Sequence, residues 1–365
     1  MADLSHYFQE LVHGKRRGLP DLLLLALLRL ASYPYALILG LRALGYRLGL
    51  LRSYSLPRPV VSVGNITLGG TGKTPMVAWI AGYLMRQGKR VVVLSRGYGG
   101  SARGEIRIVS DGSQVLLSAE EAGDEPCLLA EKVPGLMVVI GADRYRAGLR
   151  AMEELKPDLF ILDDGYQHMR LRRDLDILLL DATNPFANGV TLPAGFLREP
   201  VSAAGRADLV VYTRTPAGGV GRELFPDKPS CWTKHQFSGI VPLTGGHLCG
   251  FETAIGCRVM AFSGIAHPEA FFTGLEQVGV RPVTTLSFPD HMPYGAAEIA
   301  AILRLKVASR STVLLTTQKD AVKLVPFAES LAGCFAVVLE LAADDPRPLE
   351  AALEKVLHGA SPLPE

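Results

Sequence analysis

Short, continuous apolar runs recur along most of the chain, and segments with a helical spacing of apolar residues lie between them. Continuous runs of this kind are typical of parallel strands buried on both faces, whereas half-exposed strands alternate apolar and polar residues. The pattern predicts an α/β fold with a mostly parallel sheet and helices on both faces. The runs lie at 60–64, 90–95, 136–141, 158–163, 176–181, 208–213, 258–263, 281–288, 312–317 and 335–341.

Residues 215–257 interrupt this alternation. They are rich in glycine and proline and contain only short extended pieces, which predicts a β-type connector between two α/β regions. The predicted domains are an N-terminal helical segment (1–55), a core (56–215), the connector (216–257), a second, smaller α/β lobe (258–345) and a C-terminal tail (346–365).

The most apolar stretch of the chain is 20–51. Between Leu22 and Leu41 the only charged residue is Arg29, and Pro34 is expected to kink a helix there. A membrane-spanning helix needs about 20 mostly apolar residues, but arginines recur among leucines and tyrosines up to position 52. This mixture is typical of a helix that lies at the level of lipid headgroups. We therefore favour an interfacial, membrane-associated helix over a true span or an ordinary buried helix.

Charge is unevenly distributed. The net charge is +2, yet residues 1–55 carry seven basic and three acidic side chains, so the remainder is slightly acidic. This argues against a nucleic-acid binder and favours contact with an anionic membrane surface. The five cysteines are never spaced C-x-x-C, which predicts reduced thiols in a cytosolic protein without a zinc site. No pattern predicts an obligatory protein partner.

A glycine-rich loop follows the first apolar run. The sequence GGTGKT (69–74) lies between a β-branched run and an apolar, helix-patterned stretch. In such a loop backbone N–H groups turn toward phosphates, the lysine reaches the β- and γ-phosphates, and the threonine hydroxyl binds Mg²⁺. The usual motif has glycine where this chain has Thr67, and a tight turn with an incidental lysine is the alternative. The flanking strand and helix favour an ATP-binding, P-loop NTPase-like core with ligands Gly69, Gly70, Thr71, Gly72, Lys73 and Thr74.

A second candidate site follows the run LFILD. Parallel sheets bind ligands at the carboxyl ends of their strands, and phosphate-loop enzymes hold Mg²⁺ on acidic residues at such a position. Asp163 and Asp164 end this run. An isolated pair could equally be a helix cap, but beside a phosphate loop the pair is predicted to bind metal.

Two further motifs are ambiguous when taken alone. Asp124 in GDEP is typical of the acidic first turn of a helix. His291 in FPDHMPY is typical of a loop histidine. Neither motif by itself indicates catalysis.

Several arginines follow apolar runs, where anions bind. Arg96 lies in SRGYGG and Arg144 in GADRYRAG. The pair Arg198 and Glu199 in LPAGFLREP could be only a surface ion pair. TTQKDAVK (316–323) also ends an apolar run, and a helix-capping role for Asp320 is the alternative to a functional one.

The motifs GNITLGGTGKTP, SRGYGG, GDEP, GADRYRAG, DDGYQH, LPAGFLREP, FPDH and T-x-KD-x-VK occur in this order. The series resembles the tetraacyldisaccharide 4′-kinase (lipid A 4′-kinase) family from the apolar N-terminus to about residue 325. The resemblance implies transfer of the ATP γ-phosphoryl group to the 4′-hydroxyl of a tetraacylated glucosamine disaccharide 1-phosphate. It also implies two α/β lobes, and action at the cytoplasmic face of the bacterial inner membrane.

The resemblance further implies roles for individual residues. Lys73 and Thr74 would bind ATP and Mg²⁺, and Asp163 and Asp164 would form a Walker-B-like metal site. Asp124 and His291 would form a catalytic pair, although they fall in different predicted lobes, so their contact is expected to require lobe closure. Active-site neighbours with a role toward substrate would be Arg96, Arg144, Arg198 and Glu199.

Two other functional classes compete with a lipid kinase. A nucleotide-driven switch or partitioning ATPase usually carries a lysine directly before the two glycines, where this chain has Leu68. A metal-insertion chaperone would need a cluster of cysteine and histidine residues, and the cysteines here are scattered.

Overall fold

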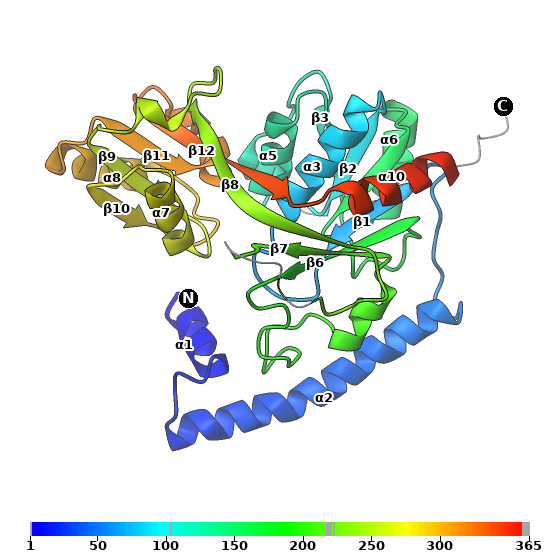
Figure 1. The fold of residues 1–365 in the computed structure, drawn as a ribbon. Helices are drawn as coiled ribbons and strands as arrows, with labels where there is room; N and C mark the ends of the chain where they lie inside the picture. Colours follow the sequence, from blue (N-terminus) through cyan, green and yellow to red (C-terminus); the bar gives the residue numbers. More distant parts are fainter. Residues whose placement is uncertain (1, 103, 217–220, 222, 360–365) are drawn as a thin grey trace. The chain divides into compact units, whose positions relative to one another are not determined.

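The computed structural model describes residues 2–102, 104–216, 221 and 223–359. The chain divides into two compact units, each assembled from separate stretches (Figure 1). The first unit comprises Met1–Met76, Arg144–Lys234 and Ala343–Glu365, and the second comprises Val77–Asp143 and His235–Ala342. Each unit is described by itself.

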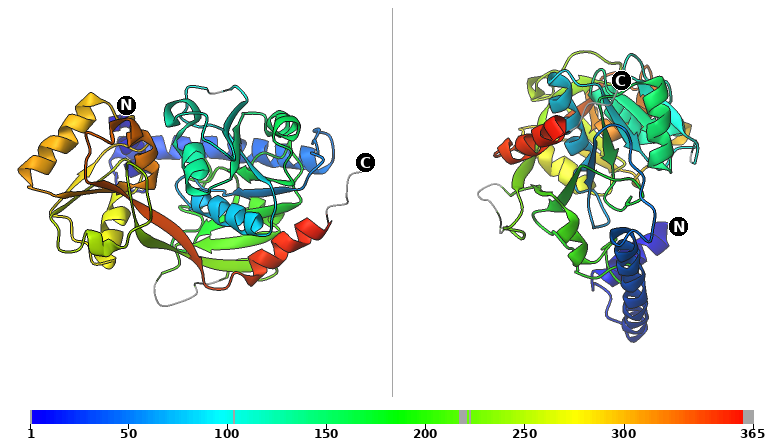
Figure 2. Two further views of the ribbon diagram at one scale, coloured as in Figure 1. Left: turned by 90° about the horizontal axis from the view of Figure 1, so that it is seen from above. Right: turned by 90° about the vertical axis from the view of Figure 1, so that its right-hand side faces the viewer.

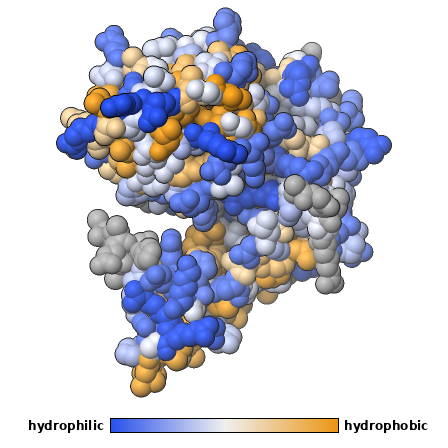
Figure 3. All heavy atoms as spheres, turned by 60° about the vertical axis from the view of Figure 1, so that its left-hand side comes forward, coloured by the Kyte–Doolittle hydropathy of each residue, from blue (hydrophilic) through white to orange (hydrophobic). Residues whose placement is uncertain are grey.

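The first unit begins with α1 (Ala2–Val12) and α2 (Leu19–Arg47). Figures 1 and 2 show α2 as one long helix along the outside of this unit, and it continues through Pro34. Its length and apolar composition are sufficient to cross a membrane, yet only 6% of its most apolar window is buried. Figure 3 shows the apolar surface of this region. Of the three alternatives for this helix, the ordinary buried helix is therefore wrong.

The sheet of the first unit contains β1 (Val60–Gly64), β5 (Leu159–Asp163), β6 (Leu175–Asp181), β7 (Leu209–Thr213) and the start of β8 (Ser230–Pro242). Their order is β8-β7-β6-β1-β5, and these pairs are parallel. All positions of β1, β5 and β7 are buried, which explains their uninterrupted apolar sequences. Because Val63 pairs with Asp163, the end of β5 lies directly beside the start of the glycine-rich loop.

Helical segments complete the first unit. They are the start of α3 (Lys73–Arg86), α6 (Arg144–Glu154), the 3₁₀ helix η1 (Val201–Arg206) and α10 (Arg347–Gly359). Ile66 after β1 and Tyr166 after β5 are buried in one apolar cluster with residues of β6 and β7. The loops that follow β1 and β5 are thereby anchored in the core.

The second unit contains two groups of strands. In the first group β2 (Val91–Ser95) is parallel to β4 (Met137–Ile140), and β3 (Arg107–Asp111) is antiparallel to β4. The second group has the order β10-β9-β11-β12, all parallel, with bounds Thr284–Ser287, Val259–Ser263, Val313–Thr317 and Cys334–Ala343.

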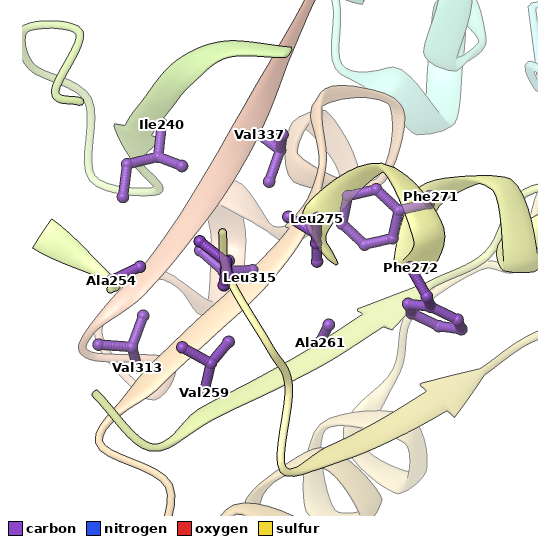
Figure 4. Close-up of a cluster of buried hydrophobic side chains, with 11 residues drawn as sticks. Ile240, Ala254, Val259, Ala261, Phe271, Phe272, Leu275, Val313, Leu315 and Val337 are labelled. Carbon is purple, nitrogen blue, oxygen red and sulfur yellow. The ribbon is translucent and has the colours of Figure 1, made fainter. Parts of the chain in front are cut away.

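Short helices accompany these strands. They are α4 (Ala119–Ala122), α5 (Asp124–Lys132), α7 (Pro268–Gln277), α8 (Ala296–Ala308), α9 (Gln318–Leu324), η2 (Phe251–Thr253) and η3 (Val325–Phe327). Figure 4 shows Phe271, Phe272 and Leu275 of α7 in one cluster with side chains of β9 and β11, namely Val259, Ala261, Val313 and Leu315. This apolar layer packs α7 against β9 and β11.

Each apolar run identified in the sequence contains a strand, and the predicted mostly parallel α/β architecture is confirmed. The strand β3 was not predicted, and the 13-residue strand β8 lies within the predicted connector, for which only short extended pieces were expected. Connector positions 217–220 and 222, and tail positions 360–365, lie outside the described residues. The predicted domain boundaries stay a prediction.

Candidate active site

The glycine-rich loop joins β1 to α3, which begins at Lys73. Gly69 and Gly72 have φ angles of +109° and +81°, a region that residues with a Cβ rarely adopt. The Thr213 hydroxyl at the end of β7 donates a 2.9 Å hydrogen bond to the Thr71 carbonyl. The loop backbone is therefore held by a neighbouring strand in a conformation that its glycines permit.

The LPAGFLREP segment braces the same loop from another direction. Leu68 N donates to Phe196 O at 2.6 Å, and Arg198 N donates to Ile66 O at 2.7 Å. These bonds fix the path of residues 66–68 and place the Arg198 side chain beside the loop.

Lys73 lies in a small network of charges. Its Nζ is 3.5 Å from Asn65 Oδ1 and 3.7 Å from Asp164 Oδ1, and Asp164 Oδ2 accepts a 2.7 Å hydrogen bond from Arg198 Nη1. Burial by itself raises the pKa of Asp164, but the charges of Lys73, Arg198 and Arg144 outweigh it and hold the pKa below its ordinary value. Asp164 is therefore ionised, and the predicted loop lysine and acidic pair meet in one site.

The acidic end of β5 can accommodate a hard cation. Asp163 is 2% exposed, and Oδ1 of Asp164 is buried and accepts no hydrogen bond from the described residues. Among those residues no three or more His, Cys, Asp or Glu side chains are grouped to enclose a metal. A pair of carboxylates fits Mg²⁺, which usually binds one or two carboxylates together with phosphate oxygens and water.

Arg198 and Glu199 point to different partners. While Arg198 binds Asp164, Glu199 is 2% exposed and accepts a 2.5 Å hydrogen bond from Arg206. Arg206 also lies over the ring of Tyr166, 4.6 Å from its centroid. The structure therefore places Arg198 among the loop charges and Glu199 in a buried ion pair. Arg144 is buried at the start of α6 and contributes to the field at Asp164.

A second polar group lies in the second unit. Asp124 is the first residue of α5, and His291 follows β10 in a loop. Nδ1 of His291 is 3.2 Å from Oδ1 and 3.1 Å from Oδ2 of Asp124. We expected this contact to require closure of two lobes, but both residues belong to one compact unit and are already in contact.

The loop SRGYGG packs against the start of α5. A Cβ on Gly100 would lie 2.3 Å from Glu121 O, and one on Gly123 would lie 2.4 Å from Tyr98 O. The Tyr98 ring is edge-on to His291, with centroids 5.9 Å apart. Close backbone approach thus brings the SRGYGG, GDEP and FPDH motifs together. Arg96 is exposed at the end of β2 and leads into this loop.

Two lysines also face Asp124, and neither was among the predicted site residues. Lys319 Nζ is 3.2 Å from His291 Nε2, 3.4 Å from Asp290 Oδ1 and 4.0 Å from Asp124 Oδ2. Lys323 Nζ is 3.7 Å from Asp124 Oδ2. Both belong to α9, and a separation of four residues places them on one face of a helix. The sequence feature that could have identified these two lysines was the T-x-KD-x-VK motif after an apolar run.

Asp320, between these lysines, fixes the surrounding backbone. It is fully buried and accepts hydrogen bonds from Gly264 N at 3.0 Å, Tyr294 Oη at 3.0 Å and Thr317 Oγ1 at 2.7 Å. It joins the ends of β9 and β11 to the segment that follows His291. Asp320 therefore does more than cap α9.

Hydrogen bonding and nearby charges shift the pKa values of both Asp124 and His291. Burial raises the pKa of Asp124, but the His291 hydrogen bond and the Lys319 and Lys323 charges outweigh it, so the pKa lies below its ordinary value. The hydrogen bond to Asp124 raises the pKa of His291 against the opposing effects of burial and Lys319. Asp124 is thus an ionised carboxylate that orients the imidazole ring.

Comparison with known proteins identifies the family. A family model described as LpxK, tetraacyldisaccharide-1-P 4′-kinase, matches residues 24–358. The chain belongs to this family. Tetraacyldisaccharide 4′-kinase of Geobacter metallireducens is 55% identical to it, over 92% of this chain and 99% of that protein. The enzyme of Pelobacter propionicus is 52% identical over 98% of this chain and 99% of that protein.

A solved structure agrees with this assignment to the 4′-kinase family. The crystal structure described as the "apo" form of LpxK from Aquifex aeolicus in complex with ATP has a TM-score of 0.78 and 35% sequence identity. It covers 92% of this chain and 99% of that chain. The predicted family and fold class are confirmed.

Proposed function

We propose that this chain transfers the γ-phosphoryl group of ATP to the 4′-hydroxyl of a tetraacylated glucosamine disaccharide 1-phosphate in lipid A biosynthesis. The observation that carries the proposal is the charged loop site, with Lys73 near Asp164, in a member of the 4′-kinase family. The Aquifex relative, whose crystal structure contains ATP, supports the choice of nucleotide.

The loop site would bind the donor. The N–H groups of Gly69, Gly70, Thr71 and Gly72 would face the phosphates, and the Lys73 ammonium would stabilise charge at the β/γ bridge. Thr74, Asp163 and Asp164 would hold Mg²⁺, which supplies a Lewis acid for the phosphate oxygens when it is bound.

The Asp124–His291 pair would accept the proton of the sugar hydroxyl. A hydroxyl is a weak nucleophile at neutral pH, and a positioned base contributes about 10²–10⁴-fold to the rate. Imidazole is suited to this because its ordinary pKa is about 6.5. The Asp124 carboxylate on Nδ1 fixes the ring orientation and stabilises the cation that forms when the ring is protonated.

Lys319 would position this pair. An ammonium group can only donate, so its 3.2 Å contact with Nε2 favours a neutral ring whose Nδ1–H faces Asp124. We propose that Lys319 and Lys323 keep Asp124 ionised and His291 in this tautomer before the acceptor binds. Arg96, Arg144 and Arg198 would contact anionic groups of the substrates, and Glu199 would support this region through Arg206.

The place of action follows from the acceptor. Its acyl chains remain in a bilayer, so we propose that α2 lies in the interface at the cytoplasmic face of the bacterial inner membrane, where ATP is present. The exposed leucines of α2 support membrane association, and its arginines support an interfacial position over a full span.

An acceptor-dependent assay tests the proposal. The protein is incubated with [γ-³²P]ATP and Mg²⁺, with and without the detergent-dispersed lipid disaccharide. We expect labelled lipid, together with ADP release that depends on the lipid. ADP release at one rate with and without the lipid, and no labelled lipid, would instead support a nucleotide-driven switch.

A further inference from the structure

A groove lies beside the C-terminal part of α2, and none of the residues that line it belongs to the loop assigned to ATP. It is bounded by residues 39–47 of α2, residues 169–173 after β5, and residues 199–206 around η1, and has a volume of about 590 Å³. We call it the α2 groove. All of these residues belong to the first unit.

The groove is strongly basic. Four arginines line it, Arg47, Arg172, Arg173 and Arg206, against a single acid, Glu199. The inner two are paired, because Arg206 binds Glu199 and Arg173 binds Asp176. The side chains of Arg47 and Arg172 are exposed and have no hydrogen-bonding or ionic partner among the described residues. Two guanidinium groups are therefore available to an anion.

Much of the remaining wall of the groove is apolar, although Ser53 and Ser202 also line it. Leu39, Ala43 and Leu44 contribute from α2, and Met169 and Ala203 contribute from the opposite side. A free inorganic anion would make no favourable contact with such an apolar wall. An amphiphile that carries a phosphate and hydrocarbon matches both halves of this lining.

The exposed apolar side chains of α2 indicate the depth at which the groove would lie in a membrane. Leu37, Ile38 and Leu41, which flank the groove-lining positions, are 63%, 63% and 58% exposed. If these side chains enter the apolar part of a bilayer, the Arg47 end of the same helix lies among the phosphates of the lipid headgroups. Basic pockets at this depth are typical sites for anionic lipid headgroups.

We propose that the α2 groove binds the phosphate of an anionic glycerophospholipid, with Arg47 and Arg172 on the phosphate oxygens and the glycerol and upper acyl chain along Leu39, Leu44 and Met169. The acceptor lipid is the less suitable occupant. A volume of about 590 Å³ suits a headgroup and the first carbons of its chains, whereas the acceptor carries two sugars and four chains. The occupied groove would fix the depth and orientation of the enzyme on the membrane.

Vesicle binding tests this site without requiring turnover, so its failure is distinguishable from failure of the kinase proposal. Sedimentation is measured with phosphatidylcholine vesicles, with and without added phosphatidylglycerol. The variants are Arg47→Ala/Arg172→Ala and a matched control, Arg281→Ala/Arg304→Ala, which removes the same charge from exposed positions in the second unit.

We expect the Arg47→Ala/Arg172→Ala variant to bind phosphatidylglycerol vesicles about 10–30-fold more weakly than the wild type, since each basic residue near an anionic surface contributes about 1 kcal/mol. The control should bind within about twofold of the wild type, and all three proteins should bind pure phosphatidylcholine equally. An equal loss in the control would show that only overall charge matters, and would overturn the proposal.

A second measurement identifies the lipid. Dihexanoyl phosphatidylglycerol, below its micelle concentration, is titrated into the wild type and the groove variant, with inorganic phosphate as a separate arm. We expect saturable binding of the lipid to the wild type only. If the variant bound the lipid as tightly as the wild type, the proposed site would be contradicted. The groove variant could instead show a higher KM for the detergent-dispersed acceptor and no loss of phospholipid binding. That result would assign the groove to the acceptor's own phosphate and refute the proposal.

Discussion

Removal of Asp124, of His291 and of both should reveal that the two residues act as one unit. Nδ1 of His291 lies 3.2 and 3.1 Å from the two oxygens of Asp124, so either substitution abolishes the same pair of contacts. Neither residue contributes to the loop that would bind ATP. We therefore expect large losses in kcat that do not add when both residues are changed.

The magnitude follows from the function assigned to the pair. A positioned base is worth about 10²–10⁴-fold, and a midpoint of about 10³-fold corresponds to about 4 kcal/mol. Two independent contributions of that size would multiply to about 10⁶-fold. A pair that acts only through its mutual contact would instead lose about 10³-fold in the double variant, which is a coupling free energy of about 4 kcal/mol.

The assay uses [γ-³²P]ATP and detergent-dispersed acceptor, and determines kcat and both KM values for His291→Ala, Asp124→Ala and the double variant. His267→Ala is the matched control, because His267 is an exposed histidine of the same unit whose side chain makes no cap hydrogen bond to α7. Circular dichroism establishes that each variant folds. Losses that multiply fully, or a rise in the KM for ATP that accounts for the lost rate, would refute the pair as a catalytic unit.

Three other substitutions and one deletion give independent expectations. Lys73→Ala should lower kcat by about 10²–10³-fold with the fold intact on circular dichroism, because one strong electrostatic donor is lost; near-normal turnover would remove the phosphate-loop interpretation. Lys319→Met removes a cation that lowers the pKa of both Asp124 and His291, so the acid limb of the pH profile of kcat/KM should move to higher pH; an unmoved limb would contradict a positioning role. Gly64→Ala should lower the free energy of unfolding by about 1–3 kcal/mol in thermal denaturation, since its Cβ would lie 2.8 Å from Tyr166 N, whereas Gly205→Ala, whose Cβ has open space, should not. Deletion of residues 1–55 should reduce activity on vesicle-embedded acceptor more than on detergent-dispersed acceptor; equal losses in a folded protein would argue against an interfacial role.

The strands of this fold were predictable because burial on both faces removes the need for polar residues. The runs at β1, β5 and β7 are buried at every position, so each is continuous in the sequence. The strand β3 has a mixed sequence, RIVSD, and is only partly buried. It pairs antiparallel with β4, and its polar positions gave no signal that separates a strand from a loop.

The two halves of the site differed in how much the sequence showed. The loop site is local, because its glycines, Lys73 and the acidic end of β5 are specified by short motifs and by the pairing of Val63 with Asp163. The Asp124–His291 contact is not local. It joins residues 167 positions apart. The sequence around Asp124 indicated only the acidic first turn of a helix, and Asp124 does lie in the first turn of α5. Only the resemblance to a family predicted that these two residues meet.

One residue in each of the two sites has a backbone conformation in the left-handed region that favours glycine. Asp164 and His291 have φ angles of +53° and +58°, where a residue with a Cβ is strained by about 1–3 kcal/mol and glycine would be relaxed. Glycine could adopt these turns but would provide neither a carboxylate for Lys73 nor an imidazole for Asp124. The strain is offset locally, by Arg198 on the Asp164 carboxylate and by Asp124 on the His291 ring. The partners that stabilise each strained turn are therefore also the partners that set its charge, so loss of Arg198 or Asp124 should loosen the turn as well as alter the ionisation of the side chain within it.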